Sequence, residues 1–284
     1  MSDMLVPLFV LRYNCLRLIT KPRFYIILII SAVYLSDITA PICEYSRLKG
    51  EPVSLWLFPL LLNNSGIVLV LFLLGVLLFC DAPFLENTEP YIFIRSGRRQ
   101  WICAQFLFVL LLSAIYIAHI ILWSIIPVFF YAAHMPEWGK ILYSLANTNA
   151  WQLVDLPTRI SSFILNQYSP KCAFGVTATI SFLVIVLIGS IMFCANLTIH
   201  RSVGNILGSL LVLEQYFATN SSGHSLYFFS PVSWVNLEVI HIDGIAKTPS
   251  VSYALAILIA LSVCCWIISF LVIRKKSIQP FKAL

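Results

Sequence analysis

The residues with the clearest chemical potential lie in one polar stretch, 81–100, between two long apolar runs. Three carboxylates come first, aromatic side chains follow, and three arginines complete the stretch. Because aromatic and arginine side chains dominate the energy of many protein interfaces, this order predicts a docking surface for a partner protein. The expected contributors are Asp81, Pro83, Phe84, Glu86, Glu89, Tyr91, Arg95, Arg98 and Arg99. A solvated loop whose arginines only set membrane topology would have a similar composition.

A second group of polar and small residues interrupts the apolar runs themselves. Its members are Asn63, Asn64, Gly204, Gly208, Glu214 and Gln215. Glu214 lies roughly 15 Å along a helix from Gly204, which is about the middle of a ~30 Å hydrocarbon core. At that depth Glu214 would line a pathway or couple helices. Alternatively, it belongs to a short span whose outer half is exposed to water. The glycines and Gln215 share a helical face that lets another helix approach, whereas the two asparagines either line a cavity or bond across helices.

Motifs for catalysis are absent from the sequence. It contains no HExxH and no GxSxG, and the Gly139-Lys140 pair lacks the glycine and the hydroxyl residue of a phosphate-binding loop. The eight cysteines show neither CxxC nor zinc spacing. An intramembrane enzyme would need paired acids, Ser or His at helix spacing, which Glu214 alone does not provide. We therefore expect no catalytic residue, no metal site and no cofactor in this chain.

The composition indicates the elements that must position these residues. Of 284 residues, 60% are hydrophobic and only 11% are charged, so a soluble domain could not cover its surface. Disordered chains have the opposite composition. The net charge of +6 comes from short basic clusters between apolar runs, which is not the pattern of a nucleic-acid-binding surface. The chain is predicted to be an integral membrane protein that does not bind nucleic acid.

Six apolar runs approach the length of about 20 residues that a spanning helix needs. The predicted fold is an all-α polytopic membrane domain over residues 1–284, with spans at about 24–40, 54–80, 101–131, 173–199, 203–219 and 251–273. Within 1–23, an amphipathic helix is expected to lie on the membrane surface. Its apolar face would carry Leu5, Leu8, Phe9, Leu16 and Ile19. The apolar segment 220–250, before the last span, is expected to dip back into the membrane or to pack on the helix ends.

The basic residues predict the orientation of these spans. If both termini are cytoplasmic, 12 of the 18 Lys and Arg residues fall on the inner side, as the positive-inside rule requires. The long segment 132–172 is then external. Cys43 and Cys172 are then also external, so the sequence allows a disulfide between them but does not establish one.

The chain resembles the membrane subunits, or permeases, of ABC-2-type transporters, especially the Gram-positive forms with a separately encoded ATPase. The matching pieces are Asp81-Ala82-Pro83-Phe84, then Tyr91, Arg95, Arg98, Arg99 and Trp101, and later Phe229-Ser230-Pro231 with Trp234. The layout of spans, surface helix and dipping segment matches over the whole chain. The long segment 132–172 is a departure from the family pattern.

This resemblance implies a multi-pass subunit of a bacterial cell membrane, surrounded by lipid, that transports without catalysis of its own. ATP and Mg would bind partner ATPase subunits, and the 81–100 loop would dock into them as a coupling helix. A second permease, identical or related, would complete the pathway, which would lie between the two subunits and be lined by parts of spans one, two and five. Export of a peptide or drug-like amphiphile is expected, with a role in antimicrobial resistance. The alternative is an ATPase-independent membrane protein for binding, sensing or immunity.

Overall fold

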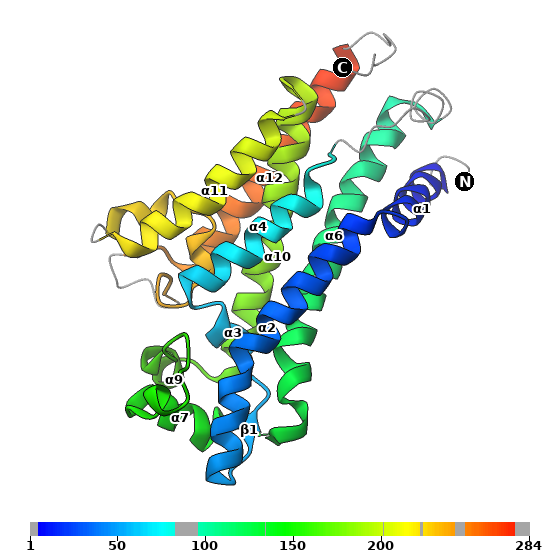
Figure 1. The fold of residues 1–284 in the computed structure, drawn as a ribbon. Coiled ribbons are helices and arrows are strands. Elements are labelled where there is room, and N and C mark those ends of the chain that lie inside the picture. The colour runs from blue at the N-terminus through cyan, green and yellow to red at the C-terminus, as the bar shows by residue number, and fades with distance from the viewer. Residues whose placement is uncertain are drawn as a thin grey trace.

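The computed structural model describes residues 5–82, 96–133, 135–200, 202–221, 224–241 and 248–275. Four of its helices are long and apolar enough to cross a membrane. They are α2 (Pro22–Lys49), α6 (Arg98–Ile125), α10 (Pro170–Thr198) and α12 (Val251–Lys275). The described chain is therefore that of a predominantly helical, membrane-embedded protein. The apolar part of α10 is 67% buried and that of α12 only 22%, so α10 forms the centre of the bundle and α12 its edge (Figure 1).

The other two predicted spans form helices that fall short of these four. Helix α4 (Ser65–Phe79) has 15 residues, which is about 22 Å and less than a ~30 Å hydrocarbon core. Helix α11 (Val203–Asn220) has 18 residues, but Asn205, Glu214 and Gln215 make it more polar. Both helices pack beside α10 or on one another, and six spans remain a prediction.

The run 54–80 is not one helix, which corrects the expected second span. It is divided into the strand β1 (Val53–Ser54), the short helix α3 (Phe58–Leu61) and α4. The side-chain oxygen of Asn64 accepts hydrogen bonds from the N–H groups of Gly66 (2.9 Å) and Ile67 (3.1 Å). This N-cap satisfies amides that a helix start leaves without partners, so a new helix begins here.

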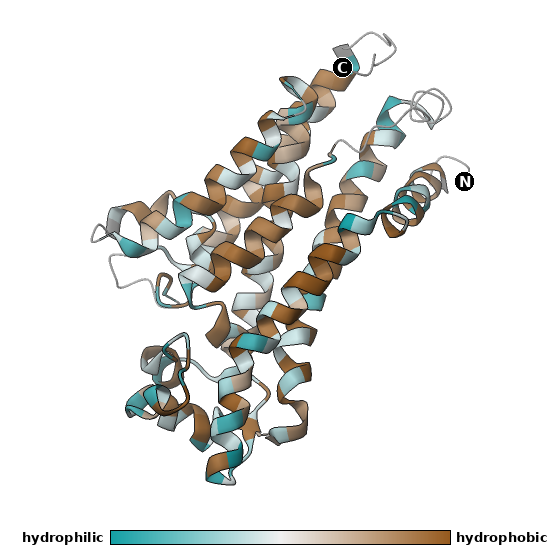
Figure 2. Ribbon diagram, viewed as in Figure 1, coloured by the Kyte–Doolittle hydropathy of each residue, from teal (hydrophilic) through white to brown (hydrophobic). Residues whose placement is uncertain are grey.

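Helix α2 is longer than the expected first span, 24–40. Its 28 residues extend about 42 Å, so one end projects beyond a ~30 Å core. It runs through Pro41 and ends at Gly50, whose positive φ of 66° suits a glycine C-cap. Figure 2 shows the change from an apolar to a more polar half along this helix. Near its end, the hydroxyl groups of Tyr45 and Ser144 are 2.8 Å apart.

The segment expected to be external folds into a compact cap opposite the chain termini (Figure 1). After α6, the 3-10 helix η1 (Ile126–Tyr131) leads to β2 (Ala132–Ala133), which pairs with β1. The cap helices are α7 (Gly139–Asn147), α8 (Ala150–Leu153) and α9 (Ser162–Gln167). Trp138 Nε1 donates to the Tyr168 carbonyl at 2.9 Å, and Tyr168 Oη donates to the Ile240 carbonyl at 3.1 Å. The latter bond joins the cap to the segment before α12.

That segment, 220–250, contains the 3-10 helices η2 (His224–Phe228) and η3 (Ser233–Val235). Val232, Trp234 and Val235 are fully buried, and Trp234 Nε1 donates to the Tyr227 carbonyl at 2.6 Å. Packing inside the protein thus explains the apolar residues of 232–240, whereas Leu226 and Phe229, earlier in the segment, are 45% and 80% exposed. Cys43 and Cys172 are not bonded to each other; the Cys43 thiol donates to the Pro127 carbonyl at 3.6 Å.

Candidate functional site

An elbow between α1 (Leu5–Ile19) and α2 positions two basic side chains at the end of the bundle that carries the termini, which we call the termini end (Figure 1). Pro22 is the first residue of α2, and Lys21 before it is extended. A residue before proline avoids the helical region, so α1 cannot continue into α2 as one helix. The Thr20 hydroxyl donates to the Arg17 carbonyl at 2.7 Å and closes the last turn of α1. Lys21 and Arg23 are thereby held on either side of this proline.

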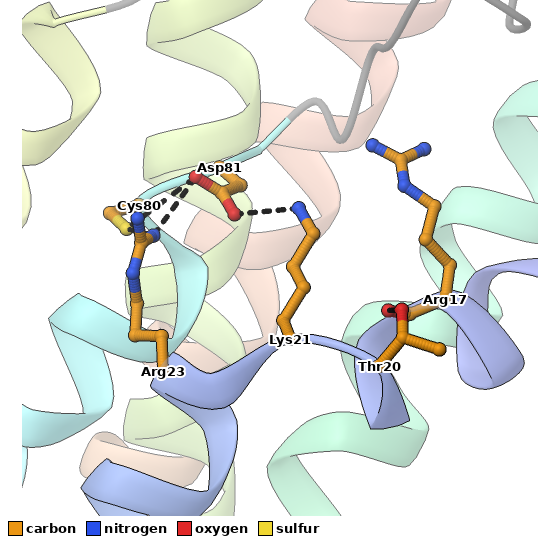
Figure 3. Close-up of polar contacts among 6 residues, drawn as sticks. All are labelled: Arg17, Thr20, Lys21, Arg23, Cys80 and Asp81. Carbon is orange, nitrogen blue, oxygen red and sulfur yellow. Dashed lines mark hydrogen bonds and ion pairs between the residues drawn. The ribbon is translucent and has the colours of Figure 1, made fainter.

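The carboxylate of Asp81 binds both of these residues (Figure 3). Its Oδ2 lies 2.9 Å from Lys21 Nζ, and its Oδ1 lies 2.9 Å from Arg23 Nη1. Arg23 also contacts the thiol of Cys80, the last residue before Asp81. These bonds connect the first residues after α4 to the elbow. Asp81 therefore binds the chain's own helices, and its predicted part in a partner surface stays a prediction.

The pKa of Asp81 reflects both its partial burial at the bundle edge and the two basic side chains that it binds. Burial alone would raise the pKa of Asp81, but the hydrogen bonds and positive charges of Lys21 and Arg23 outweigh it and lower the pKa below its ordinary value. The side chains of Asp81 and Lys21 are each 29% exposed, and that of Arg23 is 50% exposed. We call these three residues the elbow latch.

Asn196 makes a second connection to the start of the same loop. Its Nδ2 donates to the Ala82 carbonyl at 2.7 Å, and its Oδ1 accepts from the Gly204 N–H at 2.7 Å. Asn196 is 8% exposed and lies near the end of α10, whereas Gly204 lies in the first turn of α11. One side chain thus joins α10, α11 and the residue after Asp81. Asn196 is not among the residues predicted from the sequence, in which its signal is a polar amide in the last turns of an apolar run.

The far end of the loop is fixed to α12. Arg98 Nη1 donates to the Arg274 carbonyl at 2.8 Å. Trp101 is buried, and its ring lies 6.1 Å from that of Phe193 on α10. Phe193 in turn stacks on Trp266 of α12 at 4.8 Å. The first turns of α6 are therefore packed against both α10 and α12.

The remaining predicted docking residues fall into two groups. Arg99 is exposed at the start of α6 and is available to a partner. The others lie outside the residues that the structure describes: Pro83, Phe84, Glu86, Glu89, Tyr91 and Arg95. Their docking role stays a prediction.

Two of the predicted pathway residues lie where α11 and α10 touch. A Cβ atom at Gly204 would be 2.5 Å from the Met192 carbonyl oxygen, and one at Gly208 would be 3.0 Å from Met192 Sδ. Only glycine permits this approach at Gly204, because backbone atoms cannot yield cheaply. Gln215, further along α11, is 1% exposed, and neither polar atom of its side chain has a hydrogen-bond partner among the described residues.

The other pathway candidates lie toward the cap. Asn64 caps α4, and the carbonyl of Asn63 accepts a hydrogen bond from Asn236 Nδ2 at 2.8 Å. Glu214 is half-buried and close to Ser230. The structure thus brings Gly204 and Gly208 together against α10 and places the asparagines beside the segment before α12. None of the six candidates lines the small hollow beside α1 or the open hollow between α2 and η1.

Comparison of the chain with family models, curated proteins and solved structures gives no significant match. Among the residues that the structure describes, no group of three His, Cys, Asp or Glu side chains is placed to hold a metal ion. The candidate site is therefore defined by geometry: the two ends of the 81–100 loop, with the elbow latch, Asn196 and Arg98 as its anchors.

Proposed function

We propose that the chain is the membrane subunit of an ATP-driven transporter of the ABC-2 type, coupled to a separate ATPase through the 81–100 loop. The observation that carries this proposal is the anchoring of both loop ends to different helices. Asp81 is bonded to the α1–α2 elbow, Ala82 to α10 and α11 through Asn196, and Arg98 to α12. A displacement of this loop would therefore reach five helices at once.

The physical basis of such coupling is a difference in affinity between two states. A partner ATPase can change the arrangement of the helices only if it binds one arrangement more tightly than the other. Short, direct bonds between loop and helices make the two move as one body, since packed elements switch between discrete arrangements and do not deform continuously. ATP and Mg would be bound by the partner, and this chain would supply the moving helices.

The rest of the proposal extends the sequence resemblance. Six spans would cross a bacterial cell membrane with both termini in the cytoplasm. A second permease, identical or related, would enclose the pathway with spans one, two and five, and the substrate would be an exported peptide or drug-like amphiphile. On the pathway side, the close approach of Gly204 to the backbone at Met192 would fix α11 relative to α10.

The experiment is purification of the tagged chain in mild detergent from its own cells, followed by identification of co-purifying proteins. We expect a soluble protein with a P-loop in about equal amount. The chain alone, even after crosslinking, would refute the transporter proposal and favour the binding, sensing or immunity alternative. Recovery of a second permease would distinguish a heterodimer from a homodimer.

A pair of variants locates the contact. Phe84→Ala combined with Arg95→Ala should reduce the recovered ATPase about thirtyfold, as expected for the loss of two interface anchors of about 1 kcal/mol each. The matched control is Leu153→Ala combined with Lys140→Ala, which removes one exposed apolar and one exposed basic side chain from the cap. An unchanged recovery with the loop variant would refute docking through this loop.

A further inference from the structure

An open hollow lies between η1 and the half of α2 that is nearer the cap. The residues of α2 that line it recur every three or four positions and so share one helical face: Ser36, Ala40, Cys43, Glu44 and Arg47. Pro127 and Tyr131 of η1 form the opposite wall. The Cys43 thiol, which donates to the Pro127 carbonyl at 3.6 Å, connects the two walls. The volume of about 440 Å³ is in the range of small-ligand sites.

Two opposite charges line this hollow. Glu44 and Arg47 lie one turn apart on α2, and both are exposed. Among the described residues, neither side chain forms an ion pair or a hydrogen bond, with the other or with a third group. The Tyr131 hydroxyl likewise makes no hydrogen bond within the described part of the chain. The hollow therefore offers a carboxylate to a cation and, close by, a guanidinium and a phenol to an anion.

The height of the hollow in the membrane follows from the length of α2. With Lys21 and Arg23 at one membrane surface, a ~30 Å hydrocarbon core extends about 20 residues along the helix, to about residue 42. Ser36 then lies inside the core, whereas Glu44 and Arg47 lie at the level of the lipid headgroups. The hollow thus crosses the boundary between acyl chains and headgroups.

Below the hollow, the same face of α2 continues as an apolar stripe. Ile26, Ile29 and Val33 share the face that carries Glu44 and Arg47, and they are 53%, 60% and 63% exposed. The site is therefore charged at the headgroup level and apolar along the rest of the helix. This order fits an amphiphile whose head occupies the hollow and whose chain follows α2, and it does not fit a water-soluble ligand.

We propose that this hollow binds an aminophospholipid, a lipid whose headgroup carries a phosphate and a primary ammonium group. The ammonium group donates to the Glu44 carboxylate, and the phosphate accepts from Arg47 and from the Tyr131 hydroxyl. A quaternary ammonium has no N–H to donate and relies on a cage of aromatic rings, of which the described lining provides Tyr131 alone. An anionic lipid without an amine would leave the Glu44 carboxylate facing negative charge. The proposal rests on membrane embedding and is independent of transport.

The test is a lipid competition with the full chain. The purified protein is incorporated into nanodiscs of equal parts phosphatidylethanolamine and phosphatidylcholine with identical acyl chains, and the retained lipid is measured by native mass spectrometry. Wild type should retain phosphatidylethanolamine about tenfold over phosphatidylcholine, which has the same charges but no N–H donor. Glu44→Gln should abolish this preference. Arg47→Gln should lower the retention of both lipids about tenfold and keep their ratio, because both carry the phosphate.

The control is Glu137→Gln combined with Lys171→Gln, which removes one acidic and one basic exposed side chain near the cap, outside the hollow. It should change neither the retention nor the ratio, and a loss equal to that of the hollow variants would refute the site. No preference in wild type, or an unchanged preference in Glu44→Gln, would refute the proposal.

The source of the headgroup is tested with millimolar glycerophosphoethanolamine, which has the same phosphate and amine but no acyl chain. We expect it to leave the retained lipid in place. Displacement would refute the lipid proposal, because the hollow would then recognise a water-soluble zwitterion. Should a Gln variant fail to fold, the lipid ratio of wild type and this competition decide.

Discussion

Asp81 illustrates how one carboxylate can serve the inside of a chain while belonging to a loop that is expected to meet a partner. Its two oxygens are each 2.9 Å from a different basic residue, so both positions are occupied within the protein. The pairs are partly exposed, which limits their contribution to stability, since solvent screens such interactions. Their value lies in geometry: they fix the direction in which the loop leaves α4.

Replacing Asp81 by Asn should lower the unfolding temperature in detergent at neutral pH by about 2–4 °C, because the variant keeps the shape but loses both ion pairs. Folding lowers the pKa of Asp81, so the pairs stabilise the folded chain above the ordinary carboxyl pKa and fail as pH falls through the lowered value. The difference between wild type and variant should accordingly shrink below about pH 4.

Thermal unfolding between pH 3 and 7 measures this effect. The control is Glu51→Gln, whose exposed partner Lys140 lies 2.9 Å away. It should shift the unfolding temperature by less than about 1 °C. A pH-independent difference for Asp81→Asn would show that the latch is not electrostatic.

Asn196→Ala tests the second anchor. The change removes two buried hydrogen bonds and leaves the Ala82 carbonyl and the Gly204 N–H without their partner, so we expect a loss of about 2–3 kcal/mol of unfolding free energy. Asn205→Ala is the matched control, since Asn205 Oδ1 has no hydrogen-bond partner among the described residues. It should cost nothing measurable. Equal effects of the two substitutions in denaturation experiments would contradict the anchoring role of Asn196.

At the scale of elements, α11 approaches α10 at Gly204 more closely than a residue with a side chain would allow. At Gly204 a methyl group would meet a backbone oxygen and the Asn196 amide oxygen, both at 2.5 Å. The first turn of α11 is therefore held against the last turns of α10, and the connection between them is short. Any motion of the loop that reaches Asn196 is thus passed to both helices.

Gly204→Ala should destabilise the protein by about 1–3 kcal/mol because the added methyl group forces the helices apart. Gly175→Ala, in α10, has nothing within 4 Å of the new Cβ, and alanine is the better helix former. This control should be neutral or stabilise by up to about 1 kcal/mol. Thermal unfolding of both variants provides the measurement; a harmless Gly204→Ala would mean that α11 does not pack this tightly.

For the whole molecule, the bundle separates a termini end rich in basic residues from a folded cap (Figure 1). Cysteine replacement of Lys140, whose side chain is 81% exposed in the cap, should permit labelling by an impermeant maleimide in intact cells. The same replacement of Arg98 should permit labelling only after the membrane is permeabilised. The native cysteines would be replaced first, and reversed accessibility would overturn the proposed orientation.

The sequence by itself determined that the chain is membrane-embedded and helical, and it located the long helices closely. The expected spans 101–131, 173–199 and 251–273 correspond to α6 with η1, α10 and α12. The reason is local: in lipid, a long apolar run must satisfy its backbone hydrogen bonds within one helix. Composition and run length are enough to establish this.

Tertiary structure alone decided the partners of the polar groups and the limits of the irregular elements. Lys21 and Asp81 are 60 residues apart, and Asn196 and Ala82 are 114 apart, so no periodicity relates them. Helix α2 continues past residue 40, where it packs against η1 and the cap. The length of the apolar run in the sequence does not predict this packing. Local patterns specify a helix because its bonds are local, whereas an anchor depends on which distant groups the packed helices bring within bonding distance.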